Sequence, residues 1–274
     1  MQAFDREPSR ARAAALLAPA LAAAGEIALT FFGRRPRMWR KADGTPVTEA
    51  DIAVDDLLRE RLAGALPEFG WVSEESRTAS PSRADQPVWL VDPIDGTQSF
   101  ISGAEDWCIA VALLERGRPV VGGVLAPGTG DYFEAVLGSG AKLNGAPIEA
   151  SRRRELEGAH LMVKPRLLAR SDWAQPWPPV RTGVTASIAL RLCQVASGRY
   201  DATFALGHKA DWDLAAGDLI VGEAGGRVTD LDGAPLLYGE TGTRRNGFVA
   251  SGAHLHPAIV ARTTRQGTAV AGGR

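Results

Sequence analysis

The stretch Asp92-Pro93-Ile94-Asp95-Gly96-Thr97 places two carboxylates and a hydroxyl directly after a short apolar run, Val88–Val91, that predicts a buried strand. Pro93 lacks an N–H and disfavours the helical conformation at Asp92, so we expect the strand to end there. Gly96 permits a tight turn or a close approach of the backbone to a ligand. Oxygen ligands suit Mg²⁺, Mn²⁺ or Ca²⁺, whereas zinc prefers His and Cys. Asp-Pro and Asp-Gly also form ordinary turns, so the other acidic residues of the chain decide between turn and metal site.

Composition limits the classes of function. The chain has 274 residues, of which 45% are hydrophobic, enough for a large core. Its 31 basic and 32 acidic residues leave a net charge of −1, which argues against binding a nucleic acid polymer or an anionic membrane through bulk charge. Cys108 and Cys193 both lie in apolar runs, so we expect buried free thiols and a cytoplasmic, reducing location.

The N-terminal segment resembles a targeting signal. The alanine-rich run Ala13–Ala24 follows two arginines, as in a signal peptide. Acidic Asp5 and Glu7 precede it, however, and the apolar pattern continues to Phe32. The run is also too rich in alanine to make a convincing membrane span. We therefore expect a buried first helix over Ala11–Phe32 and no membrane partner.

Hydrophobic patterns and turn signals predict an α/β (α+β) chain in two halves. A charged stretch, Arg152–Glu157, indicates the boundary, giving halves 1–151 and 152–262 and a disordered tail 263–274. The segment Pro165–Pro179, rich in Pro and Trp, predicts an irregular surface segment. The expected helices are Glu49–Leu66, Ser187–Ser197, Asp211–Ala224 and His254–Arg262. The expected strands are Phe69–Val72, Cys108–Leu114, Pro119–Leu125, Tyr132–Val136, Ala141–Leu143, Tyr200–Ala205, Arg227–Leu231 and Asn246–Ser251.

Further acidic residues accompany the ends of other predicted elements. Thr48 can cap the second helix, with Asp51 as the capping-box acid three residues later. Asp51 and Asp55 share a helix face, where two like charges would gain from a nearby cation. Glu74 follows a predicted strand, and Asp213 lies in the first turn of a helix. Asp55 and Lys41 fit a site or a solvated surface equally well.

Four blocks of sequence together resemble the inositol monophosphatase family of metal-dependent, lithium-sensitive phosphatases. The resemblance runs from the first helix to about Arg262 and implies a layered αβαβα sandwich of the sugar-phosphatase type. The blocks are Lys41 with Val47-Thr48-Glu49-Ala50-Asp51, Ser73-Glu74-Glu75-Ser76, Asp92–Phe100 and Trp212–Gly226.

The resemblance implies a metal centre of two to three Mg²⁺ ions, for which Mn²⁺ can substitute. Glu74, Asp92 and the main-chain carbonyl of Ile94 would hold the first ion. Asp95 and Asp213 would hold the second, with Asp92 bridging the two. Glu74 would also help to place a weaker third ion.

The resemblance also implies catalytic and substrate-binding roles. Asp51 and Thr97 would orient the attacking water, and Glu74 would assist through its metal. The N–H groups of Gly96 and Thr97 would cradle the phosphate, and Asp213 would lie against the substrate. Hydrolysis of a phosphomonoester needs neutralised phosphoryl oxygens, an in-line water and a stabilised leaving group, and such a site can provide all three.

One position separates possible substrates. Inositol-specific members have a Glu seven residues before the final metal Asp, whereas this chain has Leu206 before Asp213. An apolar side chain cannot accept a hydrogen bond from a polyol hydroxyl. The surrounding residues look more like the bacterial 3′(2′),5′-bisphosphate nucleotidases of the CysQ type, which act on adenosine 3′,5′-bisphosphate. His208, Lys209 or Arg191 could then meet the second phosphate, although surface charge is the plainer explanation of each.

The sequence therefore predicts a Mg²⁺-dependent phosphomonoesterase acting on a small phosphorylated substrate, with a homodimer as one oligomeric possibility. A phosphatase for inositol 1-phosphate, another sugar phosphate or histidinol phosphate is the alternative on the same scaffold. A non-catalytic binder of a phosphorylated ligand is a second alternative. The complete acidic set with Asp51 and Thr97 disfavours the binder, because binding alone needs no water-activating pair.

Overall fold

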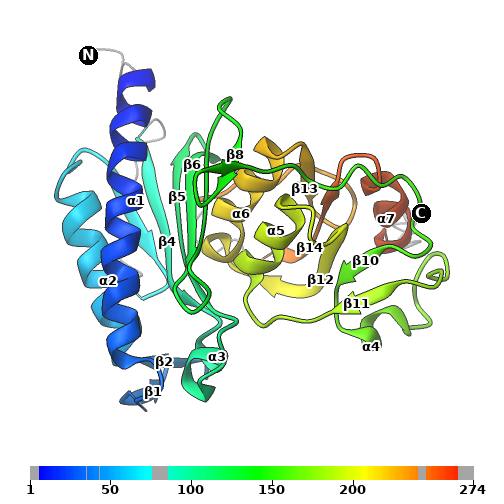
Figure 1. The fold of residues 1–274 in the computed structure, drawn as a ribbon, viewed down its shortest axis with the longest axis horizontal. Helices are drawn as coiled ribbons and strands as arrows, with labels where there is room; N and C mark the ends of the chain where they lie inside the picture. Colours follow the sequence, from blue (N-terminus) through cyan, green and yellow to red (C-terminus); the bar gives the residue numbers. More distant parts are fainter. Residues whose placement is uncertain (1–5, 35, 43, 76–85, 240–244, 265–274) are drawn as a thin grey trace, which may run out of the picture.

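The computed structural model describes residues 6–34, 36–42, 44–75, 86–239 and 245–264. Two β-sheets alternate with three layers of helices, in the order α1 and α2, first sheet, α5 and α6, second sheet, and α7 with α4 (Figure 1). The predicted α/β class and the layered αβαβα sandwich are confirmed. Apolar clusters fill the spaces between these layers.

The first sheet has seven strands in the order β3-β4-β5-β6-β7-β8-β9. Only the β3–β4 pair is parallel among these neighbours. The strands are β3 Gly70–Ser73, β4 Val88–Asp95, β5 Cys108–Glu115, β6 Arg118–Ala126, β7 Asp131–Val136, β8 Ala141–Leu143 and β9 Ala146–Pro147. A separate hairpin, β1 Met38–Arg40 with β2 Pro46–Thr48, lies beside the start of helix α2.

Strand β4 corrects one sequence prediction. The strand does not end at Asp92 but continues through Pro93 to Asp95. Asp92 pairs with Ala110 and Asp95 with Cys108, so one extra residue is accommodated between them. Proline is tolerated at such an irregularity because the ladder is already interrupted there.

Helices α1 (Arg6–Phe31) and α2 (Glu49–Leu58) cover the outer face of the first sheet. Buried Leu17 and Leu21 of α1 pack against Gly123 of β6, where a Cβ would lie 2.7 Å from the Leu21 Cδ1 atom. Within the described residues, Ser9–Phe31 is one stretch long and apolar enough to span a membrane by length and composition alone, a test that core helices also pass.

The second predicted helix is shorter than expected. Regular α-helix ends at Leu58, and Arg59–Ala63 continue as π-helix, with the Gly64 N–H donating to the Arg59 carbonyl at 3.2 Å. A Cβ at Gly64 would lie 2.2 Å from the Glu60 carbonyl oxygen, so the wider turn depends on glycine there. Leu62 stays buried, because the helix direction is kept.

The second sheet has five strands in the order β11-β10-β12-β14-β13. The strands are β10 His160–Met162, β11 Arg181–Gly183, β12 Ala202–Lys209, β13 Gly226–Thr229 and β14 Arg245–Gly252. Helix α7 (His256–Thr263) and the short helix α4 (Pro165–Leu168) lie on its outer side (Figure 1). The first sheet ends at Pro147 and the second begins at His160, so we propose the same boundary near Arg152. The predicted tail lies, from residue 265 onwards, outside the described residues.

Helices α5 (Ile188–Ala196) and α6 (Asp211–Glu223) form the middle layer and touch through a glycine. A Cβ at Gly217 of α6 would lie 2.5 Å from the Cβ of Leu192 in α5. Real Cβ atoms do not approach so closely, so any larger residue would force the helices apart. The depth at which α6 sits, and therefore the position of Asp213 at its start, depends on this contact.

We expect Gly217→Ala to lower the free energy of unfolding by about 1–3 kcal/mol, because overpacking displaces α6 from α5. The matched control is Gly222→Ala in the same helix, where a new Cβ meets nothing within 4 Å. That variant should gain up to about 1 kcal/mol from helix propensity. Urea unfolding of both variants checks the pair. Equal stabilities would show that the helices have room at Gly217.

Candidate active site

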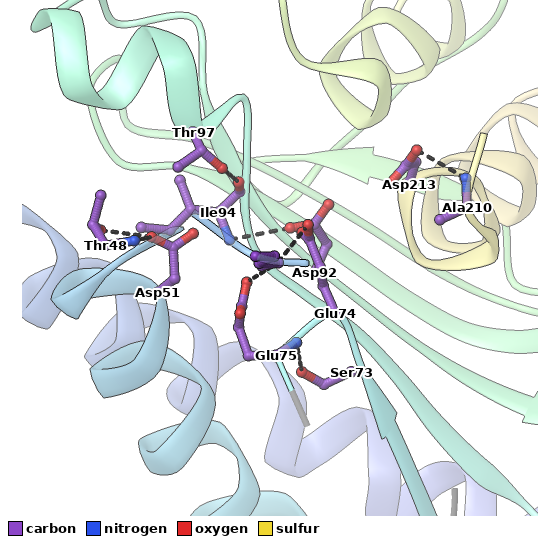
Figure 2. A network of polar contacts seen from close by, with 11 residues as sticks. Thr48, Asp51, Ser73, Glu74, Glu75, Asp92, Ile94, Thr97, Ala210 and Asp213 are labelled. Carbon is purple, nitrogen blue, oxygen red and sulfur yellow. Dashed lines mark hydrogen bonds and ion pairs between the residues drawn. The ribbon is translucent and has the colours of Figure 1, made fainter. Parts of the chain in front are cut away.

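The acidic residues of the sequence motifs gather where strand β4 ends, between helices α2 and α6. Asp92 and Asp95 are almost completely buried, with 1% and 8% of their surface exposed. Figure 2 shows Asp51, Ile94 and Thr97 to one side of Asp92 and Asp213 on the other. The charges of Glu74, Asp95, Asp213 and Asp51 all act on Asp92, so these carboxyl groups lie within electrostatic reach of one another.

The end of β4 turns sharply into helix α3 (Thr97–Ser102) at Gly96. Gly96 has φ 99°, and a Cβ there would lie 3.0 Å from the Asp106 carbonyl oxygen. Only glycine suits both constraints. The Thr97 hydroxyl donates to the Ile94 carbonyl at 3.1 Å rather than to Asp51. Gly96 thus caps, and Thr97 begins, a short helix that was not among the expected helices.

Asp51 is held by the cap of helix α2. The N–H and the hydroxyl of Thr48 donate to its Oδ2 atom at 2.8 and 2.6 Å, which completes the predicted capping box. Burial raises the pKa of Asp51 to about 6, although the Thr48 hydrogen bonds act in the opposite direction. One oxygen of the carboxylate is therefore fixed by the helix cap.

Asp95 connects the first sheet to helix α5. Its Oδ2 atom accepts hydrogen bonds from the Ser187 hydroxyl and the Ala189 N–H, each at 2.6 Å. These donors belong to the first turn of α5, where a negative charge is favoured. Burial raises the pKa of Asp95 to about 6, and the two hydrogen bonds oppose this shift.

Asp213 approaches from helix α6. Its Oδ2 atom accepts from the Ala210 N–H at 3.1 Å, which fixes the side chain at the start of that helix. The residue is partly exposed, but its carboxyl group is enclosed, and this burial raises its pKa to about 8. The charges of Asp95 and Glu74 act in the same direction. The enclosed carboxylates therefore repel one another.

Lys41 forms ion pairs at the edge of this acidic group. Its Nζ atom lies 2.8 Å from Glu74 Oε1 and 2.6 Å from Glu75 Oε1. Burial raises the pKa of Glu75 to about 7, and the Lys41 charge acts against that shift. Lys41 and Glu75 thus belong to the site's charge network. The block around Lys41 was the only sequence signal for this.

The chemistry of the donor set fits a hard divalent cation. All the side-chain donors are carboxylates that repel one another, with Asp92 and Asp95 deeply buried, and the Ile94 carbonyl lies among them. Within the described residues, however, no three His, Cys, Asp or Glu side chains stand close enough to form a ready metal cage. Oxygens of Asp95, Asp213 and Glu74 are instead tied to Ser187, Ala210 and Lys41.

A cleft of about 570 Å³ opens beside Asp213. Leu206, His208, Lys209 and Arg191, all considered from the sequence, line it. Three further basic residues line it that the sequence did not single out, namely Lys164, Arg166 and Arg170. They lie in or next to the segment Pro165–Pro179, which has a short helix and buried contacts as well as irregular surface. Three basic residues within seven positions were the available signal.

A layered sandwich with carboxylates gathered between a strand end and a helix start is the arrangement that the sequence resemblance implies. The sequence pattern of the inositol monophosphatase family matches residues 11–267, so the chain belongs to that family of phosphatases. The family is generally Mg²⁺-dependent.

Relatives carry names with different substrates. The histidinol-phosphatase of Mycobacterium tuberculosis is 36% identical over 90% of this chain and 96% of its own length. The 3′(2′),5′-bisphosphate nucleotidase CysQ of Aggregatibacter actinomycetemcomitans is 32% identical over 82% of this chain and 86% of its own length. The solved structure of the inositol monophosphatase of Anabaena (Nostoc) sp. PCC 7120 superposes with a TM-score of 0.74 at 26% identity. The superposition covers 90% of this chain and 93% of that one. Overall identity therefore does not select a substrate.

We expect Mg²⁺ to raise the thermal unfolding temperature of the wild type, because a bound cation offsets the repulsion between the carboxylates. At a hundredfold excess over the dissociation constant, the stabilisation is about 2.7 kcal/mol. Asp95→Asn keeps its acceptor toward Ser187 but removes one charge, so its stability without metal should match or exceed the wild type and its Mg²⁺ response should shrink. Differential scanning calorimetry with and without Mg²⁺ measures both effects.

The control for this experiment is Glu157→Gln, an exposed charge on the segment between the two sheets. Its Mg²⁺ response should equal that of the wild type. A full Mg²⁺ response in Asp95→Asn would rule out Asp95 as a ligand.

Proposed function

We propose that this phosphatase removes the 3′-phosphate from adenosine 3′,5′-bisphosphate in a Mg²⁺-dependent reaction. The observation that supports this substrate is the cleft that borders Asp213. A phosphomonoester with a single phosphate needs positive charge only at the reacting group, which the metal ions supply. Five lysine and arginine side chains line the adjoining cleft, which suits a substrate with a second phosphate.

Leu206 also favours a nucleotide over a polyol. Strand β12 continues through this residue, which pairs with Gly247, so its position is set by the sheet and not by a loop. The predicted strand ended one residue earlier, at Ala205. Together with Leu167 and Ile188, Leu206 gives the cleft an apolar wall. Such a wall offers no acceptor to the hydroxyls of inositol but suits an apolar group such as a base.

For the chemistry, we propose that Glu74, Asp92, the Ile94 carbonyl, Asp95 and Asp213 hold the Mg²⁺ ions. Bound Mg²⁺ would neutralise the phosphoryl oxygens, promote deprotonation of water and stabilise the leaving oxygen. The high negative charge of the buried carboxylates supports this assignment, since burying them without a counterion is costly.

Asp51 and Thr97 are proposed to orient the attacking water. Asp51, with a pKa of about 6, is ionised at neutral pH and can accept a proton or hydrogen bond from that water. The Thr97 hydroxyl hydrogen already points to the Ile94 carbonyl. Its oxygen is therefore oriented to accept a hydrogen bond from water. The Gly96 and Thr97 N–H groups at the start of α3 would bind the phosphate oxygens.

Inositol 1-phosphate, another sugar phosphate or histidinol phosphate remains the alternative substrate class. The same acidic centre would serve each of them, and the family name and the histidinol-phosphatase relative support it. A binder without activity is not favoured, because the chain belongs to a family of phosphatases.

A substrate panel tests the proposal. With Mg²⁺, we expect kcat/KM for adenosine 3′,5′-bisphosphate to exceed those for inositol 1-phosphate and histidinol phosphate. The physical reason is that only the bisphosphate engages both the acidic centre and the basic cleft. Phosphate release measured for each substrate gives the comparison. A preference for inositol 1-phosphate would replace the nucleotide by the alternative class.

Substitution of Leu206 tests the origin of that preference. Leu206→Glu should raise kcat/KM on inositol 1-phosphate about ten- to hundredfold, because it adds a charged acceptor for a hydroxyl. The same carboxylate should lower kcat/KM on the bisphosphate by repulsion. Leu206→Gln is the control, since it has similar size and an acceptor but no charge. If Leu206→Glu and Leu206→Gln lower kcat/KM for the bisphosphate equally, charge repulsion is not the cause.

A further inference from the structure

We infer that Lys164 and Arg166, presented by the Pro/Trp-rich segment, form the subsite for the second phosphate of the substrate. This inference rests on the proposed function, since it names the residues that would select a bisphosphate. It also gives a role to the segment Pro165–Pro179, to which the sequence alone assigned none. The residues lie away from the acidic centre in sequence and reach it through the shared cleft.

The placement of these two side chains follows from a helix start. Lys164 ends the extended backbone that follows β10, with φ −65° and ψ 127°, and Pro165 begins helix α4. Proline at the first helical position has a preset φ and lacks an N–H that the helix does not need there. Arg166 follows on the first turn. Both side chains are thus carried by a defined element that borders the cleft.

The charges of the cleft are strongly unbalanced. Five lysine and arginine side chains line it against one carboxylate, that of Asp213. Burial lowers the pKa of Lys209 and the Asp213 charge opposes this, while the charges of Arg191 and Lys164 add to the lowering, so these three cations lie within electrostatic reach of one another. Asp172 pairs with Arg170, and the charges of Asp95 and Asp106 act on Arg191. The remaining positive charge of the cleft favours an anion. A second phosphate is an anion of the required charge.

Three of the five lysine and arginine side chains of the cleft already have hydrogen-bond acceptors. The Nζ atom of Lys209 donates to the His208 carbonyl at 3.0 Å. Arg170 forms a two-pronged ion pair with Asp172. The Nε and Nη2 atoms of Arg191 donate to the Thr185 carbonyl at 3.0 and 2.7 Å. Neither Lys164 nor Arg166 forms an ion pair with any carboxylate in the part of the chain that the structure describes. Their charges are therefore available to a ligand.

Aromatic packing holds the segment in place. The ring of Trp177 stacks on Phe204 of β12 at 4.8 Å and 7°. Trp173 packs edge-on against both rings, at 5.8 and 5.6 Å, and its Nε1–H donates to the Leu167 carbonyl at 2.7 Å. Phe204 lies two residues before Leu206 on the strand that leads to Asp213. The same strand thus anchors the basic segment and precedes the acidic helix.

The test compares two substrates with the same reacting centre, adenosine 3′,5′-bisphosphate and adenosine 3′-monophosphate. The double variant Lys164→Ala/Arg166→Ala should lower kcat/KM for the bisphosphate about ten- to hundredfold, mainly through KM. Its kcat/KM for the monophosphate should stay within about twofold of the wild type. Added salt should reduce the substrate preference of the wild type more than that of the variant, because it screens these exposed charges.

The matched control is Arg154→Ala/Arg181→Ala, which removes two exposed positive charges from the same half but outside the cleft. This control should leave the ratio of the kcat/KM values for the two substrates unchanged. Trp177→Ala should lower the ratio of kcat/KM for the bisphosphate to kcat/KM for the monophosphate, as the double variant does. Trp177→Phe should keep most of the wild-type ratio. That rescue would distinguish positioning of the segment from a general loss of stability, which thermal unfolding of each variant also reports.

Calorimetric binding of both nucleotides separates this inference from the proposed activity. If the protein hydrolyses neither nucleotide but binds the bisphosphate more tightly, and the double variant loses that difference, the subsite stands and the proposed activity fails. In another outcome, the wild type hydrolyses phosphomonoesters while the double variant lowers kcat/KM for both nucleotides equally, or for neither. That outcome overturns the subsite and leaves the phosphatase assignment standing.

Discussion

The mutual repulsion of buried carboxylates is the constraint on which this structure depends. Asp51, Asp92, Asp95 and Asp213 all have pKa values raised first by burial, and neighbouring acids add to the shift. Each group is accordingly tied to a donor from a helix cap, a backbone N–H or a hydroxyl. Lys41 neutralises only part of the negative charge, which is why the site suits cations. The surrounding layers exist to hold these groups close together in spite of that repulsion.

Helices α5 and α6 connect the repelling groups across the two sheets. The start of α5 donates to Asp95 from the first sheet, whereas the start of α6 carries Asp213. Their close contact at Gly217 therefore couples the two acidic positions. The small size of Gly217 therefore helps to set the distance between the charges of Asp95 and Asp213. The basic residues of the cleft come largely from a different segment, although Asp213 lines the same cleft.

Local signals in the sequence predicted much of the fold and of the acidic set. The Thr48–Asp51 cap, the glycine turn at Gly96 and the helix start at Asp211 are short-range features, and each was found where expected. Two predictions failed, the first for a reason that is not local and the second through a widened helical turn. Strand β4 passes Pro93 because pairing with β5 absorbs an extra residue. The helix after Thr48 widens at Arg59–Ala63, where the Gly64 N–H reaches back to the Arg59 carbonyl.

The sequence by itself determined the kind of chemistry, because carboxylates, a hydroxyl and a glycine turn keep their properties in any surroundings. Only the tertiary structure decided that Lys41 neutralises part of the acidic group and that Lys164 and Arg166 border the same cleft as Asp213. The contact between Trp177 and Phe204 that holds this arrangement joins residues on separate elements. Side-chain packing between distant segments has no periodic signal along the chain, so proximity of this kind emerges only when the layers assemble.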